Sequence, residues 1–134
     1  MVKQKTTAEI AAELPESAAV ISAGEDNSGF ANLATSLAEI RKLKGVSGFI
    51  LRSDTSAIVD LTEQDTIIEY AILSSQISES SREMAKQFSM ADIESVLVEG
   101  KSVKVLCMSV GENRISVFME KTATHAWIIK RILL

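Results

Sequence analysis

A run of three strand-like segments near the C-terminus constrains the fold most: residues 93–98, 102–110 and 114–120. Short turns that contain Gly100 and Gly111 separate these segments, which predicts two consecutive hairpins. Both faces of the middle segment are largely apolar, because period-two alternation puts two Val and a Cys on one face and Leu, Met and Val on the other. A sheet that is apolar on both faces needs a layer of helices on each side.

The preceding residues supply two further strands and most of the helical residues. A hairpin is predicted over 46–61, where the unbroken apolar run 49–51 indicates a strand that is covered on both faces. Helices are predicted over 29–42, about 65–88 and 122–134, from apolar residues at helical spacing and from capping residues. The sequence therefore predicts a sheet with the long helix on one side and the first and last helices on the other.

Residues 1–28 differ from the rest of the chain and are interpreted as an N-terminal arm, a short helix plus a linker. The helix is predicted over 8–14 and ends before Pro15, because proline disfavours helical geometry in the residue that precedes it. An arm that packs on the domain or on a partner and a partly disordered tail both fit these residues. The domain itself is assigned to residues 29–134.

The long helix carries two apolar lines and an unusual number of serines. The main line consists of Tyr70, Leu73, Ile77, Met84 and Phe88, and Ile68 and Ile72 start the second line. Five serines accompany them: Ser74, Ser75, Ser78, Ser80 and Ser81. Serine is a middling helix former, so the cluster is either a solvated face or a small-residue surface for close approach of another helix. A symmetric dimer would supply that second helix.

Composition excludes several classes of function. The net charge is −4 and Lys and Arg are scattered along the chain, which argues against nucleic-acid binding. One cysteine and one histidine exclude an intramolecular disulfide and a multi-Cys or His-rich metal site. No apolar run approaches the roughly 18 residues of a membrane span, and charges interrupt any signal-peptide core, so cytoplasm is the expected location and no direct membrane insertion is expected.

Catalytic patterns are absent from the sequence. The fragment 99–102, Glu-Gly-Lys-Ser, lacks the earlier glycine and the following helix of a phosphate-binding loop. His125 lies in an apolar helix and Cys107 lies in an apolar strand, so packing roles are expected for both. No catalytic residue, cofactor-binding residue or metal ligand is predicted, and the function is expected to reside in the protein surface.

The order of elements resembles the roadblock / dynein light chain family, whose domain regulates small GTPases, over about residues 27–134. The resemblance rests on the junction Leu43-Lys-Gly-Val-Ser-Gly-Phe, on Asp54 in the next turn, and on the strand pair around Glu99-Gly-Lys-Ser, followed by the closing strand and the apolar helix. One departure is Thr55, since the family often has Gly after the turn acid.

The resemblance implies an α+β fold with a five-stranded antiparallel sheet and helices on both faces, a profilin-like architecture. It also implies dimers in which long helices pair and one sheet continues into the other. Family members act as platforms for Ras-like GTPases or as parts of dynein and membrane-associated scaffolds, and some bacterial relatives accelerate GTP hydrolysis. An arginine finger is one way to do so, for which Arg52 and Arg114 are candidates.

The leading hypothesis is therefore a non-enzymatic homodimer that serves as a scaffold or regulator for a small Ras-like GTPase. The expected interface residues lie on the long helix and on the strand after it: Tyr70, Leu73, Ser74, Ile77, Ser78, Ser81, Met84, Ile93, Ser95 and Leu97. Two alternatives remain open: a small-molecule-binding sensor domain with a profilin- or PAS-like sheet, and a purely structural scaffold subunit.

Overall fold

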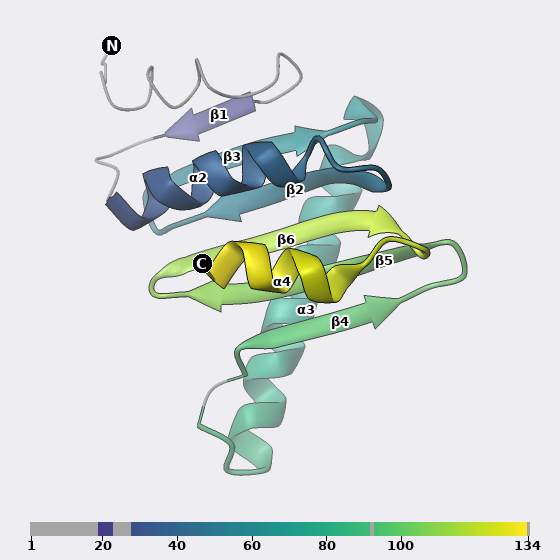
Figure 1. The fold of residues 1–134 in the computed structure, drawn as a ribbon. Coiled ribbons are helices and arrows are strands. Elements are labelled where there is room, and N and C mark those ends of the chain that lie inside the picture. Colours follow the sequence, from purple (N-terminus) through teal and green to yellow (C-terminus); the bar gives the residue numbers. More distant parts are fainter. Residues whose placement is uncertain (1–18, 23–27, 92, 134) are drawn as a thin grey trace.

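The computed structural model describes residues 19–22, 28–91 and 93–133. Figure 1 shows the elements, which are β1 (Ala19–Ser22), α2 (Ser28–Ile40), β2 (Val46–Arg52), β3 (Ser56–Leu61), the 3-10 turn η1 (Gln64–Thr66), α3 (Ile67–Gln87), β4 (Ser95–Glu99), β5 (Val103–Val110), β6 (Asn113–Glu120) and α4 (His125–Leu133). The predicted helices and strands from residue 29 onward are present and differ from the observed ones only at their ends. The helix predicted over 8–14 lies outside the described residues.

The strands form one sheet in the order β1-β3-β2-β6-β5-β4, with every neighbouring pair antiparallel. The five predicted strands are confirmed. β1 is a sixth strand, which the sequence analysis did not predict, and it pairs with β3 so that Ala19 lies opposite Val59. The described sheet therefore has β1 at one edge and β4 at the other.

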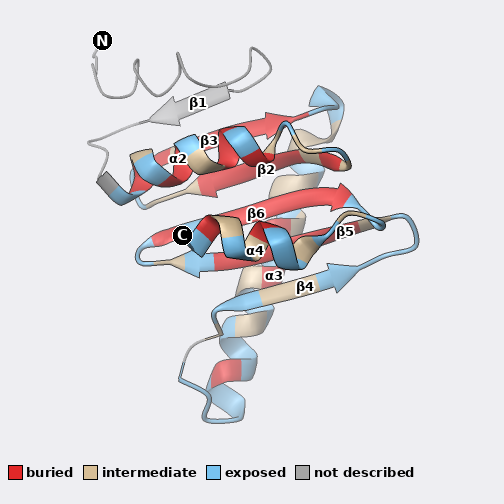
Figure 2. Ribbon diagram, in the orientation of Figure 1, coloured by how far each residue is buried: buried red, intermediate tan, exposed pale blue. Residues whose placement is uncertain are grey.

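Helices cover both faces of the sheet, as predicted. α2 and α4 lie on one face and α3 crosses the other (Figure 1). Burial follows this layering, since the central strands β2, β6 and β5 are mostly buried while β4 is largely exposed (Figure 2).

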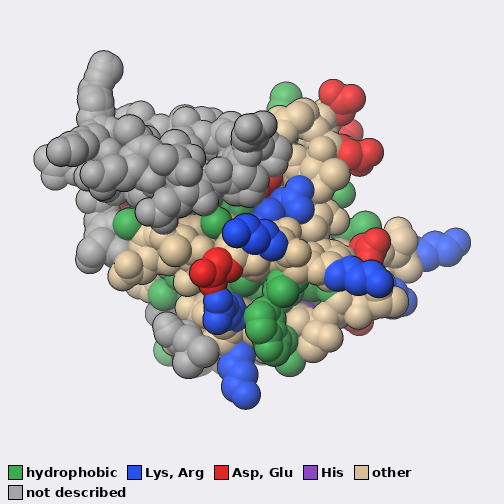
Figure 3. All heavy atoms as spheres, turned by 45° about the horizontal axis from the view of Figure 1, so that its top comes forward, with side chains coloured by type: hydrophobic (Ala, Val, Ile, Leu, Met, Phe, Trp, Pro, Cys, Tyr) green, Lys and Arg blue, Asp and Glu red, His purple; other side chains and the backbone are tan. Residues whose placement is uncertain are grey.

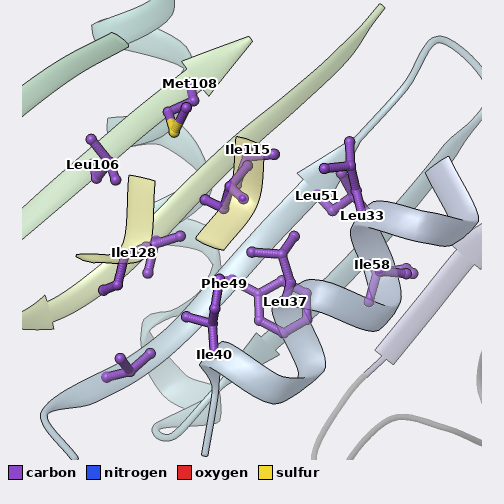
Figure 4. Close-up of a cluster of buried hydrophobic side chains, with 14 of the residues drawn as sticks. Leu33, Leu37, Ile40, Phe49, Leu51, Ile58, Leu106, Met108, Ile115 and Ile128 are labelled. Carbon is purple, nitrogen blue, oxygen red and sulfur yellow. The ribbon is translucent and has the colours of Figure 1, made fainter. Parts of the chain in front are cut away.

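The alternation of side chains along the strands divides the core into two clusters. On the α2/α4 face, Leu37 and Ile128 from the helices pack with Phe49 and Ile115 from the strands (Figure 4). On the α3 face, the cluster contains Ile50, Val59, Leu61, Ile77, Val105, Cys107 and Phe118. The predicted split of β5 is confirmed, because Leu106 and Met108 belong to the first cluster while Val105 and Cys107 belong to the second.

The junction between α2 and β2 is held by a buried ion pair. The Nε atom of Arg41 lies 3.4 Å from Oδ1 of Asp60, whose side chain is fully buried in β3. The same guanidinium donates hydrogen bonds to the carbonyl oxygen of Val46 at 3.2 Å and to the hydroxyl of Thr62 at 2.8 Å. These contacts fix the end of α2 to the first hairpin.

Gly48 allows the closest approach in that hairpin. A Cβ atom at this position would lie 2.2 Å from the carbonyl oxygen of Asp60 and 2.7 Å from Cα of Leu61. The pairing of β2 with β6 also shifts its register between Val46 and Gly48. Only glycine fits here without displacement of the neighbouring strand.

Candidate protein interface

The first half of α3 packs on the sheet through the main apolar line of the helix. The ring of Tyr70 stacks on the ring of Phe118, with a centroid distance of 4.5 Å and an interplanar angle of 13°. Leu73 packs against the same core cluster, and only 9% of Ile77 is exposed. These contacts anchor α3 across the strands.

The second half of α3 extends beyond the sheet. In Figure 1 the helix passes behind β4 and continues past this edge strand, and in Figure 2 most of that half is exposed. Met84 follows Ile77 by about two helical turns, so it lies on the same side of the helix, and Phe88 is the C-cap residue about one turn later. Nevertheless 45% of Met84 and 71% of Phe88 are exposed, whereas only 8% of Ala85, the residue after Met84, is exposed.

β4 is an edge strand with few features that block pairing. Its sequence Ser-Val-Leu-Val-Glu contains neither proline nor lysine, and it pairs with β5 on one side. Val98 is 40% exposed, although its neighbours Val96 and Leu97 pack against the two core clusters. Natural edge strands usually carry charges, proline or a covering segment, so an open apolar edge indicates a surface for pairing.

A groove of about 760 Å³ runs between the second half of α3 and the sheet. Ser78 and Ser81 line its helix side, where the Ser81 hydroxyl donates a hydrogen bond to the Ser78 carbonyl oxygen at 2.9 Å. The charged side chains in the lining balance one another: Arg82, Lys86 and Arg114 against Asp54, Glu94 and Glu112. The lining therefore favours a polar or mixed surface over an apolar ligand.

The structure divides the predicted interface residues into three groups. Ser74 and Ile77 are buried within the chain, and Tyr70 and Leu73 pack half-buried on the α3-side core. Half-buried residues that line the groove are Ser78, Ser81 and Ile93, and half-buried Leu97 packs against the α2/α4-side core. Met84 and Ser95 lie exposed on α3 and β4.

Three exposed apolar residues near this edge were not among the predicted interface residues: Phe88, Met90 and Val98. Phe88 was already part of the predicted apolar line of α3, which was the available signal. Its exposure depends on where the sheet ends relative to the helix, and periodicity along one helix does not contain that information.

The two candidate arginines are neighbours in space. Arg52 and Arg114 lie directly opposite each other in the pairing of β2 with β6, and Arg114 lines the groove. Like charges in directly opposite positions are destabilising, so this pair concentrates positive charge at one end of the sheet.

Comparison with known proteins decides the family. The family model of the Roadblock/LC7 domain matches residues 33–117. The chain belongs to the Roadblock/LC7 domain family. No curated protein matches the chain by sequence.

Solved structures have the same fold as this roadblock domain at low sequence identity. A Roadblock/LC7 domain from Streptomyces avermitilis is 16% identical with a TM-score of 0.61, and the alignment covers 82% of this chain and 90% of that one. MglB of Myxococcus xanthus is 16% identical with a TM-score of 0.60 and coverages of 77% and 87%. The gliding protein MglB of Thermus thermophilus is 13% identical with a TM-score of 0.63 and coverages of 80% and 84%.

The chemically reactive side chains of the roadblock domain have packing partners. Burial raises the pKa of the Cys107 thiol, although the Ser116 hydroxyl at 3.5 Å opposes this shift. Nδ1 of His125 lies 3.0 Å from Nζ of the buried Lys104. Within residues 19–22, 28–91 and 93–133, no group of three or more His, Cys, Asp or Glu side chains is placed to hold a metal ion. In the same residues, no helix is long and apolar enough to cross a membrane.

Proposed function

We propose that this roadblock domain forms a homodimer through α3 and β4 and that the dimer is a scaffold or regulator for a small Ras-like GTPase. The observation that carries the proposal is the apolar line of α3, which is buried at Ile77 and open at Met84 and Phe88. Membership in the Roadblock/LC7 family supports the GTPase as partner, since that is the function the family resemblance implies.

A two-fold axis perpendicular to the sheet accounts for the exposed edge. Two β4 strands that pair antiparallel about such an axis continue one sheet into the next and satisfy the open edges of both. The partner's strands then lie beneath the overhanging half of α3 and cover Met84 and Phe88. Both α3 helices lie on the same face of the extended sheet, where they form one platform.

The outer side of α3 is the part of this platform that we assign to the GTPase. Ile68 is 73% exposed and Ile72 is 53% exposed. Ile72 precedes Ile77 by five residues, which places it on the far side of the helix from the sheet. Exposed apolar side chains that the dimer leaves uncovered suit contact with a second protein.

A pull-down from lysate tests the proposed partner. The full chain is the bait, and the lysate contains added GDP or a non-hydrolysable GTP analogue. A Ras-like GTPase retained with one nucleotide and lost with Ile72→Glu supports the proposal, while the exposed α4 variant Leu133→Glu serves as a matched control. Retention of no GTPase with either nucleotide contradicts it. Arg52→Ala and Arg114→Ala then test, in a hydrolysis assay, whether either residue accelerates the partner.

The groove beneath α3 favours one alternative function, a small-molecule sensor. Its volume of about 760 Å³ is in the range of ligand pockets, but its charged lining differs from the apolar lining that is usual for them. A ligand-dependent rise in melting temperature in the absence of any GTPase would support the sensor.

We also propose that residues 29–134 form the domain and that residues 1–28 form an arm, whose described strand β1 extends the sheet.

A further inference from the structure

The fold gathers basic side chains that are scattered in the sequence onto the α2/α4 side of the sheet. The cations of this surface, which we call the basic face, are Lys42, Lys44, Lys121, Lys130 and Arg131. The loop after α2 and the loop before α4 are adjacent, because the backbone N–H of Glu120 donates to the carbonyl oxygen of Gly45 at 2.7 Å. Lys42, Lys44 and Lys121 therefore lie on neighbouring loops, beside the helix that carries Lys130 and Arg131.

Among the residues that the structure describes, acidic side chains do not cancel this charge. The acids of these elements are Glu39 and Glu120, and Glu39 forms an ion pair with Arg131. On the opposite side of the sheet, η1 and α3 carry Asp65, Glu69, Glu79 and Glu83 against Arg82 and Lys86. The described part of the chain is thus electrically polar across the sheet, and the full chain carries a net charge of −4.

An apolar patch lies among these cations. Trp127 is 46% exposed and Leu133 is 63% exposed on α4, and the guanidinium of Arg131 lies 5.9 Å from the centroid of the Trp127 ring. Figure 3 shows Lys and Arg side chains around hydrophobic side chains on this side of the molecule. Tryptophan beside lysine and arginine is the combination that favours the boundary between lipid headgroups and acyl chains.

We propose that the basic face docks on an anionic phospholipid surface, with Trp127 in the headgroup region. Charge complementarity argues for the negative surface, since each Lys or Arg near an anionic membrane contributes to attraction. The half-exposed Trp127 ring among these cations favours a lipid surface over an acidic peptide, because tryptophan is enriched at the level of the headgroups. The acids of α3 lie behind the sheet, where salt with a Debye length of about 8 Å screens their repulsion.

The proposed dimer strengthens this attachment, and this step alone rests on the proposed function. A two-fold axis perpendicular to the sheet leaves both basic faces on the same side of the extended sheet. One membrane then contacts both faces at once, which raises the apparent affinity without new contacts. The platform of paired α3 helices points away from the lipid, toward a bound partner.

Trp127 is the single tryptophan of the chain, so its fluorescence reports this face directly. The full-length protein is titrated with vesicles of phosphatidylcholine alone or with added phosphatidylserine, and bound protein is measured by sedimentation. We expect a blue shift of Trp127 emission and sedimentation with the anionic vesicles only, both lost at high salt. The double variant Lys121→Glu/Lys130→Glu is expected to lower the partition coefficient of the protein from water onto the anionic vesicles by roughly tenfold or more.

A matched control keeps the result specific to the face. Arg82→Glu with Arg114→Glu makes the same change in net charge on the α3 side and leaves vesicle binding unchanged. Equal binding to neutral vesicles, binding without a change in Trp127 emission, or equal binding of the Lys121/Lys130 variant overturns the proposal. A blue shift of Trp127 emission with polyglutamate but not with vesicles also overturns the proposal and assigns the basic face to an acidic protein. If Met84→Glu/Phe88→Glu is monomeric by light scattering and binds vesicles as well as the unaltered chain, only the contribution of the dimer is overturned.

Discussion

Ile77 lies in α3 and Phe88 caps the C-terminal end of this helix about three turns later, yet 9% of the first and 71% of the second is exposed. Ile77 packs in the α3-side core cluster, whereas Phe88 caps the end of α3, which extends past the edge strand β4 in Figure 1. This relationship separates the residues that fold the single chain from those that are available to a partner.

Arg41→Ala is expected to destabilise the protein by about 3 kcal/mol, because it removes the ion pair with the buried carboxylate of Asp60. Urea denaturation measures this change. Arg131→Ala is the matched control, since its ion pair with Glu39 is exposed and such pairs contribute about 1 kcal/mol or less. Equal losses for the two variants would contradict the structural role given to Arg41.

Gly48→Ala is expected to cost about 3 kcal/mol or more, because the added methyl group would lie 2.2 Å from the backbone oxygen of Asp60. Gly111→Ala provides the comparison, since its Cβ would meet nothing within 4 Å and only its φ of +62° is unfavourable. That backbone strain is about 1–2 kcal/mol. Thermal denaturation that ranks Gly111→Ala as the more severe variant would exclude the close approach at Gly48.

The two substitutions of the Lys104–His125 pair are expected to differ in effect. His125→Ala leaves the buried ammonium of Lys104 without its partner at 3.0 Å and is expected to cost about 1–3 kcal/mol. Lys104→Met removes the buried charge and keeps the aliphatic volume, so stability is expected to stay the same or to rise. A double-mutant cycle in urea tests the pair, and additive effects would mean that the contact contributes nothing.

Stability is expected to fall at alkaline pH because of Cys107. Burial raises the pKa of this thiol in the folded state, so the unfolded chain releases its proton first as the pH rises above the ordinary value of 9.0. The stabilisation is complete below that value and is lost as the pH rises toward the folded-state pKa, by up to about 1.4 kcal/mol per pH unit. Cys107→Ala should show a shallower alkaline decline in urea denaturation, and an identical decline would refute the assignment.

The fold was largely predictable because its signals are local. Alternation in β5 and β6 and the unbroken apolar run in β2 correctly implied helices on both sides of the sheet. β1 was not predicted, since it consists of Ala19–Ser22 and its pairing with β3 depends on residues about forty positions away. The basic face was not predicted for a similar reason, because Lys44 and Lys121 become neighbours only when Gly45 meets Glu120.

Helical periodicity predicts the interface residues of α3, and the structure adds which residues of each apolar line are exposed to solvent. Tyr70 and Ile77 follow the same spacing as Met84 and Phe88, so the sequence alone groups them together. Only the position of β4 under α3 distinguishes the residues that pack inside the chain from those at the surface. For this reason Ile77→Glu would test folding, whereas substitutions at Phe88 test association.

Light scattering on the full chain and on Met84→Glu/Phe88→Glu at micromolar concentration tests the central claim most directly. We expect the mass of a dimer for the unaltered chain and of a monomer for the variant, because two carboxylates would replace apolar side chains at the proposed contact. Leu133 on α4 is exposed to a similar degree, so Leu133→Glu is the control and should leave the dimer intact. A monomeric mass for the unaltered chain, or a dimer that survives Met84→Glu/Phe88→Glu, would contradict the interface.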